Sequence, residues 1–245
     1  TLRHGGEPRA ARHARLAEPA GRAGAGLVSV VTRPEHVASI LARRPECMVT
    51  SQTDLGPLLH KATVVVIGPG LGQQEWSQSL LRQALASPLP LVLDADGLNL
   101  LARWHEQGDP LARRGNWVIT PHPGEAARML HASTAQIQPN RFDTVRALQQ
   151  QYAAVAVLKG AGSLIAGNDG RIWLSNTGNP GMASGGMGDV LSGVIGSLLA
   201  QHVPTLEAAA LGVCLHGAAA DRAAGDGQRG LLASDLLPHM RALLG

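Results

Sequence analysis

The sequence has few aromatic residues, few lysines and few cysteines. Phe, Tyr and Trp make up 2% of the 245 residues, and the only lysines are Lys61 and Lys159. Nucleic-acid binding uses aromatic side chains for stacking and a basic surface for phosphates, so this composition argues against a nucleic-acid partner. Cys47 and Cys214 lie far apart and form neither a disulfide framework nor a zinc motif. We predict no metal-ligating residues in the chain.

The sequence also has no long apolar run. No stretch approaches the roughly 20 apolar residues that span a bilayer, and the N-terminus lacks the apolar segment of a signal peptide. We therefore expect a cytoplasmic protein with no membrane partner. Residues 1–24 hold five Arg and two Glu, so they account for the whole formal net charge of +3. The rest of the chain is neutral.

From residue 27 onward, short apolar runs alternate with helical patterns. The runs are apolar on both faces, which is typical of strands buried in a parallel sheet; they span 27–32, 62–68, 89–96, 116–121 and 155–160. Amphipathic helical patterns lie between them, at 34–44, 75–86, 124–130 and 140–152. This alternation predicts one α/β domain over residues 25–245, with a mostly parallel central sheet and helices on both faces. An Asn-Asp-Gly turn within 163–176 predicts a β-hairpin at the sheet edge.

Residues 1–24 do not follow this alternation. They contain no strand-like run, their arginines have no matching apolar stripe, and Pro8 and Pro19 interrupt them. We expect this atypical segment to be poorly ordered, or at best a weak helix.

Four predicted strands end in residues that favour a ligand site. The segments that follow them are "GPGLG" (68–72), "DADGLN" (94–99), "TPHPGE" (120–125) and "KGAGS" (159–163). Each alone is ordinary turn chemistry, but ligands of open α/β sheets bind at the carboxyl ends of the strands. "GPGLG" with Asp94 imitates a dinucleotide-binding fingerprint with the wrong glycine spacing, and no P-loop is present. The four segments together indicate one binding site.

Two side chains in these segments have alternative interpretations. His122 is flanked by Pro121 and Pro123, and it is either a satisfied histidine or a substrate contact at a strand end. Lys159 closes an apolar strand, where a buried ammonium is costly unless it meets an anion. It either extends its charge to solvent or contacts a phosphate.

The stretch "NPGMASGGMGDVLSG" (179–193) joins a glycine-rich loop to a helix that begins near residue 186. Successive glycines allow several backbone N–H groups to converge into an anion site that continues into the positive end of the helix. Asp189 at the helix start is either a helix cap or a base that accepts a proton from a hydroxyl as a phosphoryl group arrives. The residues therefore point to phosphoryl transfer.

Six ordered motifs resemble those of the ADP/ATP-dependent NAD(P)H-hydrate dehydratase family. They are "VVVIGPGLGQ", "LVLDADGLNLLA", "VITPHPGEAARML", "AVLKGAG", "GNPGMASGGMGDVLSG" and "HGAAAD". The resemblance runs from about residue 23 to the end and implies a ribokinase-like fold. It implies an enzyme that repairs hydrated NADH and NADPH: ADP phosphorylates the hydrate hydroxyl, phosphate leaves, and the ring double bond is restored. Mg²⁺ would screen the transferring phosphoryl group.

The resemblance also implies roles for individual residues. Gly72, His122 and Asp189 would contact the hydrated nicotinamide, with Asp189 as the catalytic base. The nucleotide-binding residues would be Lys159, Gly160, Ala161, Gly162, Ser163 and Gly188.

The front of the chain departs from the family pattern. We expect the family's first strand and helix, which precede "RAGAGLV", to be missing, and we expect this chain to lack the epimerase half of bifunctional members. Two alternatives therefore stay open: a non-catalytic remnant that binds nucleotide, and a ribokinase-like kinase of a small alcohol. We also expect a homo-oligomer with a small-molecule substrate.

Overall fold

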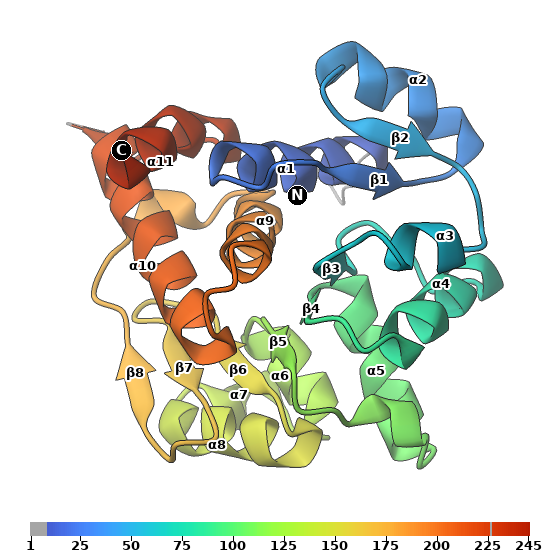
Figure 1. The fold of residues 1–245 in the computed structure, drawn as a ribbon. Helices are drawn as coiled ribbons and strands as arrows, with labels where there is room; N and C mark the ends of the chain where they lie inside the picture. Colours follow the sequence, from blue (N-terminus) through green and yellow to red (C-terminus); the bar gives the residue numbers. More distant parts are fainter. Residues whose placement is uncertain (1–8, 226) are drawn as a thin grey trace, which may run out of the picture.

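The computed structural model describes residues 9–225 and 227–245. Its central sheet has six strands in the order β3-β4-β5-β6-β7-β8 (Figure 1). The first four are parallel, and β6, β7 and β8 pair antiparallel. The bounds are β3 Val65–Ile67, β4 Leu91–Leu93, β5 Trp117–Ile119, β6 Val155–Leu158, β7 Leu164–Ala166 and β8 Ile172–Leu174. The predicted parallel strands and the edge hairpin are confirmed.

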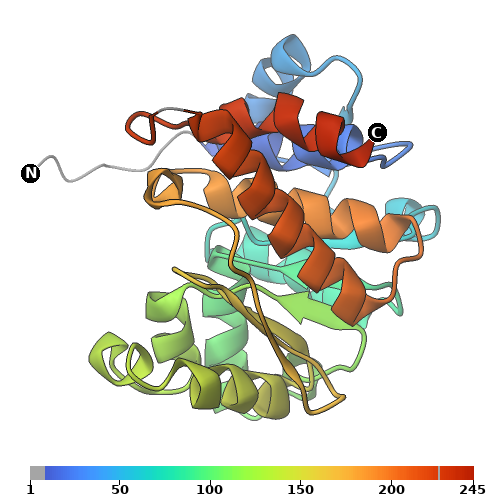
Figure 2. The ribbon, with the colours of Figure 1, turned by 90° about the vertical axis from the view of Figure 1, so that its left-hand side faces the viewer.

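Strands β4, β5 and β6 are buried throughout because both of their faces are apolar. Successive side chains point to opposite faces, so Leu91, Leu93 and Trp117 enter one core cluster while Val92 and Val118 enter the other. The first cluster packs under helices α4 (Glu75–Ala86), α5 (Asp96–Glu106), α6 (Pro123–Met129) and α8 (Arg141–Tyr152). The second packs under α9 (Met187–Ala200), α10 (Thr205–Ala224) and α11 (Leu236–Leu244). Figure 2 shows the two helical layers on opposite sides of the sheet.

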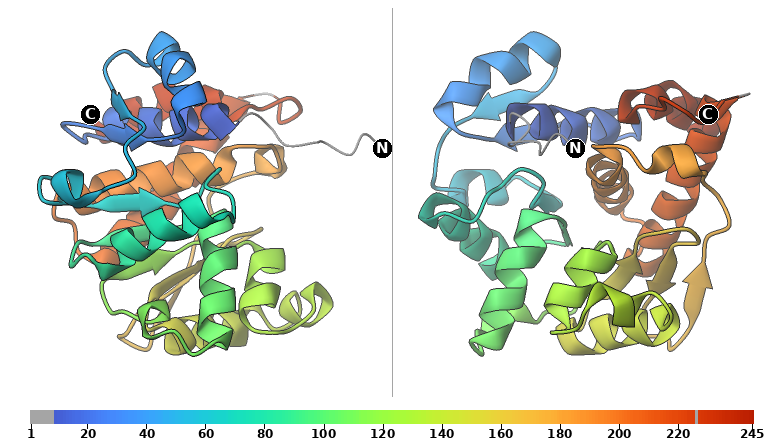
Figure 3. Two further views of the ribbon diagram at one scale, coloured as in Figure 1. Left: turned by 90° about the vertical axis from the view of Figure 1, so that its right-hand side faces the viewer. Right: turned by 180° about the vertical axis from the view of Figure 1, so that it is seen from behind.

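The segment predicted as a strand at 27–32 does not join this sheet. It forms β1 (Ser29–Val31), which pairs in parallel only with β2 (Met48–Thr50) in a separate two-stranded sheet. Within β1 only Val30 is buried, so this strand lacks the two-sided burial of the central strands. Helix α2 (Pro34–Arg43) connects the two strands, and Figure 3 shows this unit beside α1 at one end of the molecule.

Of the two alternatives expected for residues 1–24, a poorly ordered segment or a weak helix, the structure has a helix over most of the segment. Helix α1 (Arg9–Arg22) lies there and packs against α9. From Leu16 onward, where its side chains are described, the buried ones are small, namely Ala17, Pro19 and Ala20, followed by Ala23, and they do not stand out as an apolar stripe in the sequence. A helix therefore leads into "RAGAGLV". Residues 1–8 lie outside the described part.

Five further short elements complete the part of the chain that the structure describes. They are the helical turns α3 (Gly56–Leu59), α7 (Thr134–Ile137) and the 3-10 turns η1 (Pro110–Ala112), η2 (Pro180–Met182) and η3 (Ala233–Asp235). Among the described residues, none of the helices has the length and apolar character needed to cross a bilayer.

The contact between α1 and α9 generates the first prediction. A Cβ added to Gly193 of α9 would lie 2.5 Å from the backbone oxygen of Leu16 in α1, so Gly193→Ala should push the helices apart. We expect a loss of about 1–3 kcal/mol in the free energy of unfolding, measured in urea, as is typical of overpacked contacts. Gly21→Ala is the matched control because a Cβ there has no neighbour within 4 Å. It should be neutral or stabilising through helix propensity. Equal behaviour of the two variants would contradict the packing of α1 on α9.

Candidate active site

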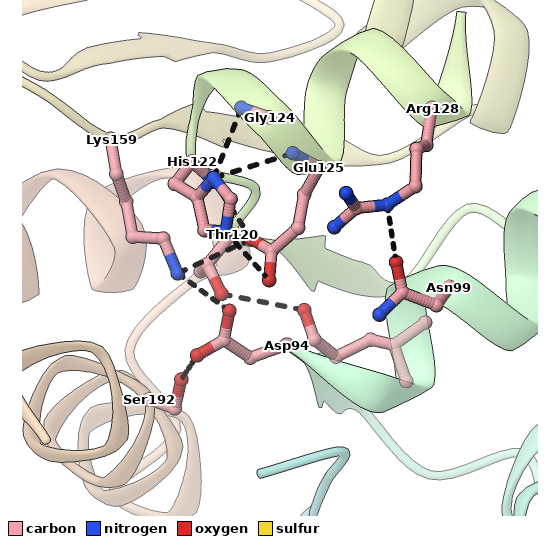
Figure 4. Close-up of polar contacts among 10 residues, drawn as sticks. Asp94, Asn99, Thr120, His122, Gly124, Glu125, Arg128, Lys159 and Ser192 are labelled. Carbon is pink, nitrogen blue, oxygen red and sulfur yellow. Dashed lines mark hydrogen bonds and ion pairs between the residues drawn. The ribbon is translucent and has the colours of Figure 1, made fainter. Parts of the chain in front are cut away.

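The carboxyl ends of β4, β5 and β6 bring a group of charged side chains together (Figure 4). Lys159, after β6, places its Nζ 2.7 Å from Asp94 Oδ1 and 3.8 Å from Glu125 Oε2. Ser192 of α9 donates a hydrogen bond of 3.1 Å to the other Asp94 oxygen. Three of the four strand-end segments identified in the sequence therefore meet directly, and they meet the helix that follows the glycine-rich loop.

Lys159 is a cation held by two buried carboxylates. Burial alone lowers the pKa of Lys159, but the negative charges of Asp94 and Glu125 outweigh it, and the pKa is raised above its ordinary value. Asp94 is 2% exposed and Glu125 is 5% exposed, so both carboxylates depend on this cation for charge compensation. The sequence left open whether Lys159 extends to solvent or meets an anion. In this structure the anions are carboxylates of the protein, and a phosphate contact stays a prediction.

His122 caps helix α6. Its Nδ1 accepts hydrogen bonds from the backbone N–H groups of Gly124 (3.0 Å) and Glu125 (3.3 Å). In return, the Glu125 carboxylate accepts a hydrogen bond of 2.8 Å from the backbone N–H of His122. Such a capping box satisfies backbone donors at both ends of the turn. Because Nδ1 accepts, the ring proton of the neutral form is on Nε2. Burial lowers the pKa of His122, against the opposing charge of Glu125, which favours that neutral form.

The "GPGLG" loop approaches the next strand very closely. Gly68 has a φ of 125°, and a Cβ there would lie 1.8 Å from the carbonyl oxygen of Asp94, so only glycine fits. Gly72 is buried at the end of the loop, and its N–H donates to the Asp96 carboxylate at 2.8 Å. The structure therefore brings Gly72 to the same edge of the sheet as His122. Its N–H is already bonded, so any substrate contact would use the rest of its backbone.

The glycine-rich loop enters α9 through Gly186, which has a φ of 92° and occupies the N-cap position. Asp189 lies inside the first turn and is 7% exposed, so it is not the helix cap. An acid in the first turn still interacts favourably with the positive end of the helix. Gly188 does not have a positive φ. A Cβ on it would lie 3.2 Å from Lys159 Nζ and 3.3 Å from Asp94 Oδ2, which places the start of α9 against the charged group.

The "KGAGS" turn between β6 and β7 is anchored by an arginine that the sequence analysis did not identify. Arg141 of α8 donates hydrogen bonds to the carbonyl oxygens of Leu158 (3.3 Å), Ala161 and Gly162 (2.9 Å). Gly160 and Gly162 have positive φ values of 149° and 66°, and Ser163 Oγ donates to the Gly160 carbonyl. The turn is therefore fixed by one guanidinium group. Only the fold could reveal this, because Arg141 and the turn lie on separate elements.

Two residues of the "HGAAAD" segment in α10 also face this region. Asp221 accepts hydrogen bonds from the Gly178 N–H (2.8 Å) and from Asn179 Nδ2 (3.0 Å), so it holds the beginning of the glycine-rich loop. His216 is buried, and burial together with the positive charge of Lys159 lowers the pKa of His216 to about 4, against a hydrogen bond with the Met187 backbone. Sequence reasoning assigned neither residue a role.

This arrangement is the ribokinase-like α/β fold, with a mixed sheet, helices on both faces and a glycine-rich helix start at the carboxyl edge of the strands. A family model described as NAD(P)H-hydrate dehydratase matches residues 10–241. The chain belongs to this family of enzymes.

Three relatives support the assignment. The chain is 53% identical over 93% of its length to the bifunctional NAD(P)H-hydrate repair enzyme of Coxiella burnetii, but it spans only 46% of that protein. It is 40% identical to the ADP-dependent (S)-NAD(P)H-hydrate dehydratase of Neisseria meningitidis, over 84% of this chain and 70% of the relative. The structure of the ADP/ATP-dependent NAD(P)H-hydrate dehydratase from Bacillus subtilis, co-crystallised with ATP and Mg²⁺ and soaked with CoA, matches with a TM-score of 0.82 and 29% identity, covering 98% and 90% of the two chains.

The Arg141 anchor generates a prediction about the nucleotide loop. Arg141→Met removes the donors that hold three carbonyls, so the turn should lose its fixed shape and bind ADP more weakly. We expect the rise in melting temperature at millimolar ADP to shrink markedly, because stabilisation by a ligand follows its affinity for the folded state. Arg146→Met is the control: Arg146 lies on the same helix, and its ion pair among the described residues is with exposed Asp143. An undiminished ADP shift in Arg141→Met would show that the anchor does not shape the loop.

The low pKa of His216 predicts a pH dependence of stability. His216 has an ordinary pKa of 6.5 when unfolded and about 4 when folded. Its neutral form therefore contributes stability above pH 6.5 that is lost as the pH falls toward 4, by up to roughly 3 kcal/mol. In urea unfolding at pH 7 and pH 4, the advantage of the wild type over His216→Gln should diminish or reverse on acidification. A difference that is the same at both pH values would disprove a neutral buried His216.

Proposed function

We propose that this chain catalyses the ADP-dependent dehydration of the S form of hydrated NADH and NADPH. The observation that carries the proposal is the position of Asp189. It lies buried in the first turn of α9, next to Gly188, where an added Cβ would lie 3.2 Å from Lys159 Nζ and 3.3 Å from Asp94 Oδ2. A carboxylate beside a helix N-terminus combines an anion-binding backbone with a proton acceptor. The names of the relatives support the same reaction.

The first step would transfer the terminal phosphoryl group of ADP to the hydroxyl of the hydrate. Asp189 would accept the hydroxyl proton while the oxygen forms its bond to phosphorus and the bond to the AMP oxygen breaks. In the second step the carbon–oxygen bond breaks, inorganic phosphate leaves, and the neighbouring ring carbon loses a proton to restore the double bond. The products are AMP, phosphate and NADH or NADPH.

The residues of the site would divide this work. The turn at 159–163 and the start of α9 at Gly188 would hold the nucleotide phosphates through their backbone. The His122 ring, whose Nε2 lies 3.4 Å from Glu125 Oε1, would contact the nicotinamide part of the substrate, and so would Gly72. Among the described residues, no cluster of three or more His, Cys, Asp or Glu side chains is arranged to hold a metal ion. A Mg²⁺ ion would therefore enter with the nucleotide, as Mg²⁺ commonly does, and screen the phosphoryl charge.

The other expectations about the chain stay predictions. We propose a homo-oligomer that acts on a small molecule in the cytoplasm, without nucleic-acid or membrane partners. Bifunctional repair enzymes are among the relatives of this chain. We propose no epimerase activity for the described residues.

The decisive experiment follows the recovery of NADH absorbance from purified S hydrate with ADP and Mg²⁺. The wild type should restore NADH, and Asp189→Asn should lower turnover per folded molecule by about 10²–10⁴-fold, the usual contribution of a general base. Asp143→Asn, at an exposed position of α8, is the control and should be unaffected.

Two results would refute the proposal. Consumption of nucleotide only with an added hydroxymethyl or thiazole alcohol would identify a small-alcohol kinase. Thermal stabilisation by ADP without turnover of either kind of substrate would identify a nucleotide-binding remnant. If Asp189→Asn keeps more than about a tenth of the wild-type rate, Asp189 is not the base.

A further inference from the structure

Arg33 joins the small two-stranded sheet to the start of helix α4. It follows β1, directly before Pro34 of α2, and lies outside the four strand-end segments. Its Nη2 donates a hydrogen bond of 2.7 Å to Gln74 Oε1, and its guanidinium carbon lies 4.8 Å from the ring centroid of Trp76. Gln74 is the N-cap residue of α4, and Trp76 lies in the first turn. Arg33 therefore holds the beginning of this helix.

Side chains make this connection because the two sheets are not joined through their strands. Within the described part of the chain, β1 and β2 form their own sheet, and β3 is the edge strand of the larger one. A second contact lies near the other end of α4. Gln83 donates to the Thr53 carbonyl at 2.9 Å and accepts from the Leu55 N–H at 2.8 Å. Both ends of α4 are thus connected to the segments that follow β1 and β2.

The start of α4 in turn holds the backbone of the "GPGLG" loop. Ser77, also in the first turn, is buried, and its Oγ donates a hydrogen bond of 2.6 Å to the carbonyl of Leu71. Leu71 directly precedes Gly72, whose N–H belongs to the same peptide unit and donates to Asp96 at 2.8 Å. The peptide unit is therefore held from both sides. A displacement of the first turn of α4 would change its orientation.

The contact of Arg33 with α4 brings little net stability. The Nε of Arg33 is buried and has no hydrogen-bond partner in the described part of the chain. An unsatisfied buried donor carries a desolvation cost similar in size to what a charged hydrogen bond contributes. The consequence of the contact therefore lies in where it places α4 more than in how much it stabilises the fold.

We propose that Arg33 is a positioning residue for the substrate loop: it fixes the start of α4 and, through Ser77, the orientation of the peptide unit before Gly72. The inference rests on the proposed function, which gives Gly72 a contact with the hydrated nicotinamide. Arg33 itself does not touch the substrate. Its loss weakens binding of the hydrate and leaves the nucleotide turn at 159–163 unchanged, because that turn follows β6 and is held by Arg141.

The kinetic test compares Arg33→Met with the wild type, because methionine keeps apolar packing but loses the hydrogen bond and the charge. KM for the hydrate should rise about tenfold, as for the loss of one hydrogen bond, with little change in kcat per folded molecule and none in KM for ADP. Arg33→Lys should have a smaller effect, since lysine keeps a cation but not the planar fork.

Arg43→Met is the matched control, because Arg43 is an exposed arginine on α2 of the same small unit. It should leave both KM values unchanged. An unchanged KM for the hydrate in Arg33→Met would overturn the proposal. An equal rise in KM for the hydrate and for ADP would also overturn it, because it would indicate a general loosening of the site.

Hydrogen exchange separates this proposal from the proposed reaction, because it needs no turnover. In Arg33→Met, the backbone amides of residues 70–77 should exchange about tenfold faster than in the wild type, since the loss of one hydrogen bond shifts local opening by about that factor. The amides of residues 159–163 should be unaffected. Faster exchange confined to 70–77 supports the positioning role even if the wild type does not restore NADH from the hydrate. Equal exchange in the two proteins overturns it.

Discussion

The ion pair between Lys159 and Asp94 is the contact on which the arrangement of the site depends. It joins the ends of β6 and β4 across β5, and Ser192 extends it to α9. Breaking a buried ion pair by removing one partner typically costs about 3–5 kcal/mol because the other charge stays buried. Removal of Lys159 would leave both Asp94 and Glu125 without their cation. The pair therefore fixes the distance between two strand ends and the helix start that carries Asp189.

Close packing around this pair accounts for the glycines at positions 68 and 188, which also lie in the segments assigned to the site. Gly68 leaves room for the Asp94 backbone, and Gly188 leaves room for the Lys159 and Asp94 side chains. Each glycine allows one element to approach the charged group more closely than any other residue would. At Gly188 the need is for space and not for an unusual backbone angle, whereas Gly186 has a left-handed backbone at the N-cap. The same glycines thus shape the fold and bring backbone N–H groups to the site.

Local patterns predicted much of this architecture, and long-range contacts account for the rest. The central strands were predictable because both faces of each strand are apolar, and His122 and Lys159 were found because they end such strands. Helix α1 was expected at best as a weak helix, since the backbone of Leu16 and Ala20 and the small side chain of Pro19 make its contact with Gly193. Arg141 and His216 gave no local signal, because their partners lie on other elements. The role of Lys159 was ambiguous for the same reason: only the fold shows that Asp94 lies within 2.7 Å of it.

The charge balance of the site limits how much its side chains would attract an anion. Lys159 faces two carboxylates, with Asp189 nearby, so the charged group at the strand ends has no excess of positive side chains to offer a nucleotide. Attraction for the nucleotide would then come from backbone groups, at the positive end of α9 and in the turn that Arg141 shapes.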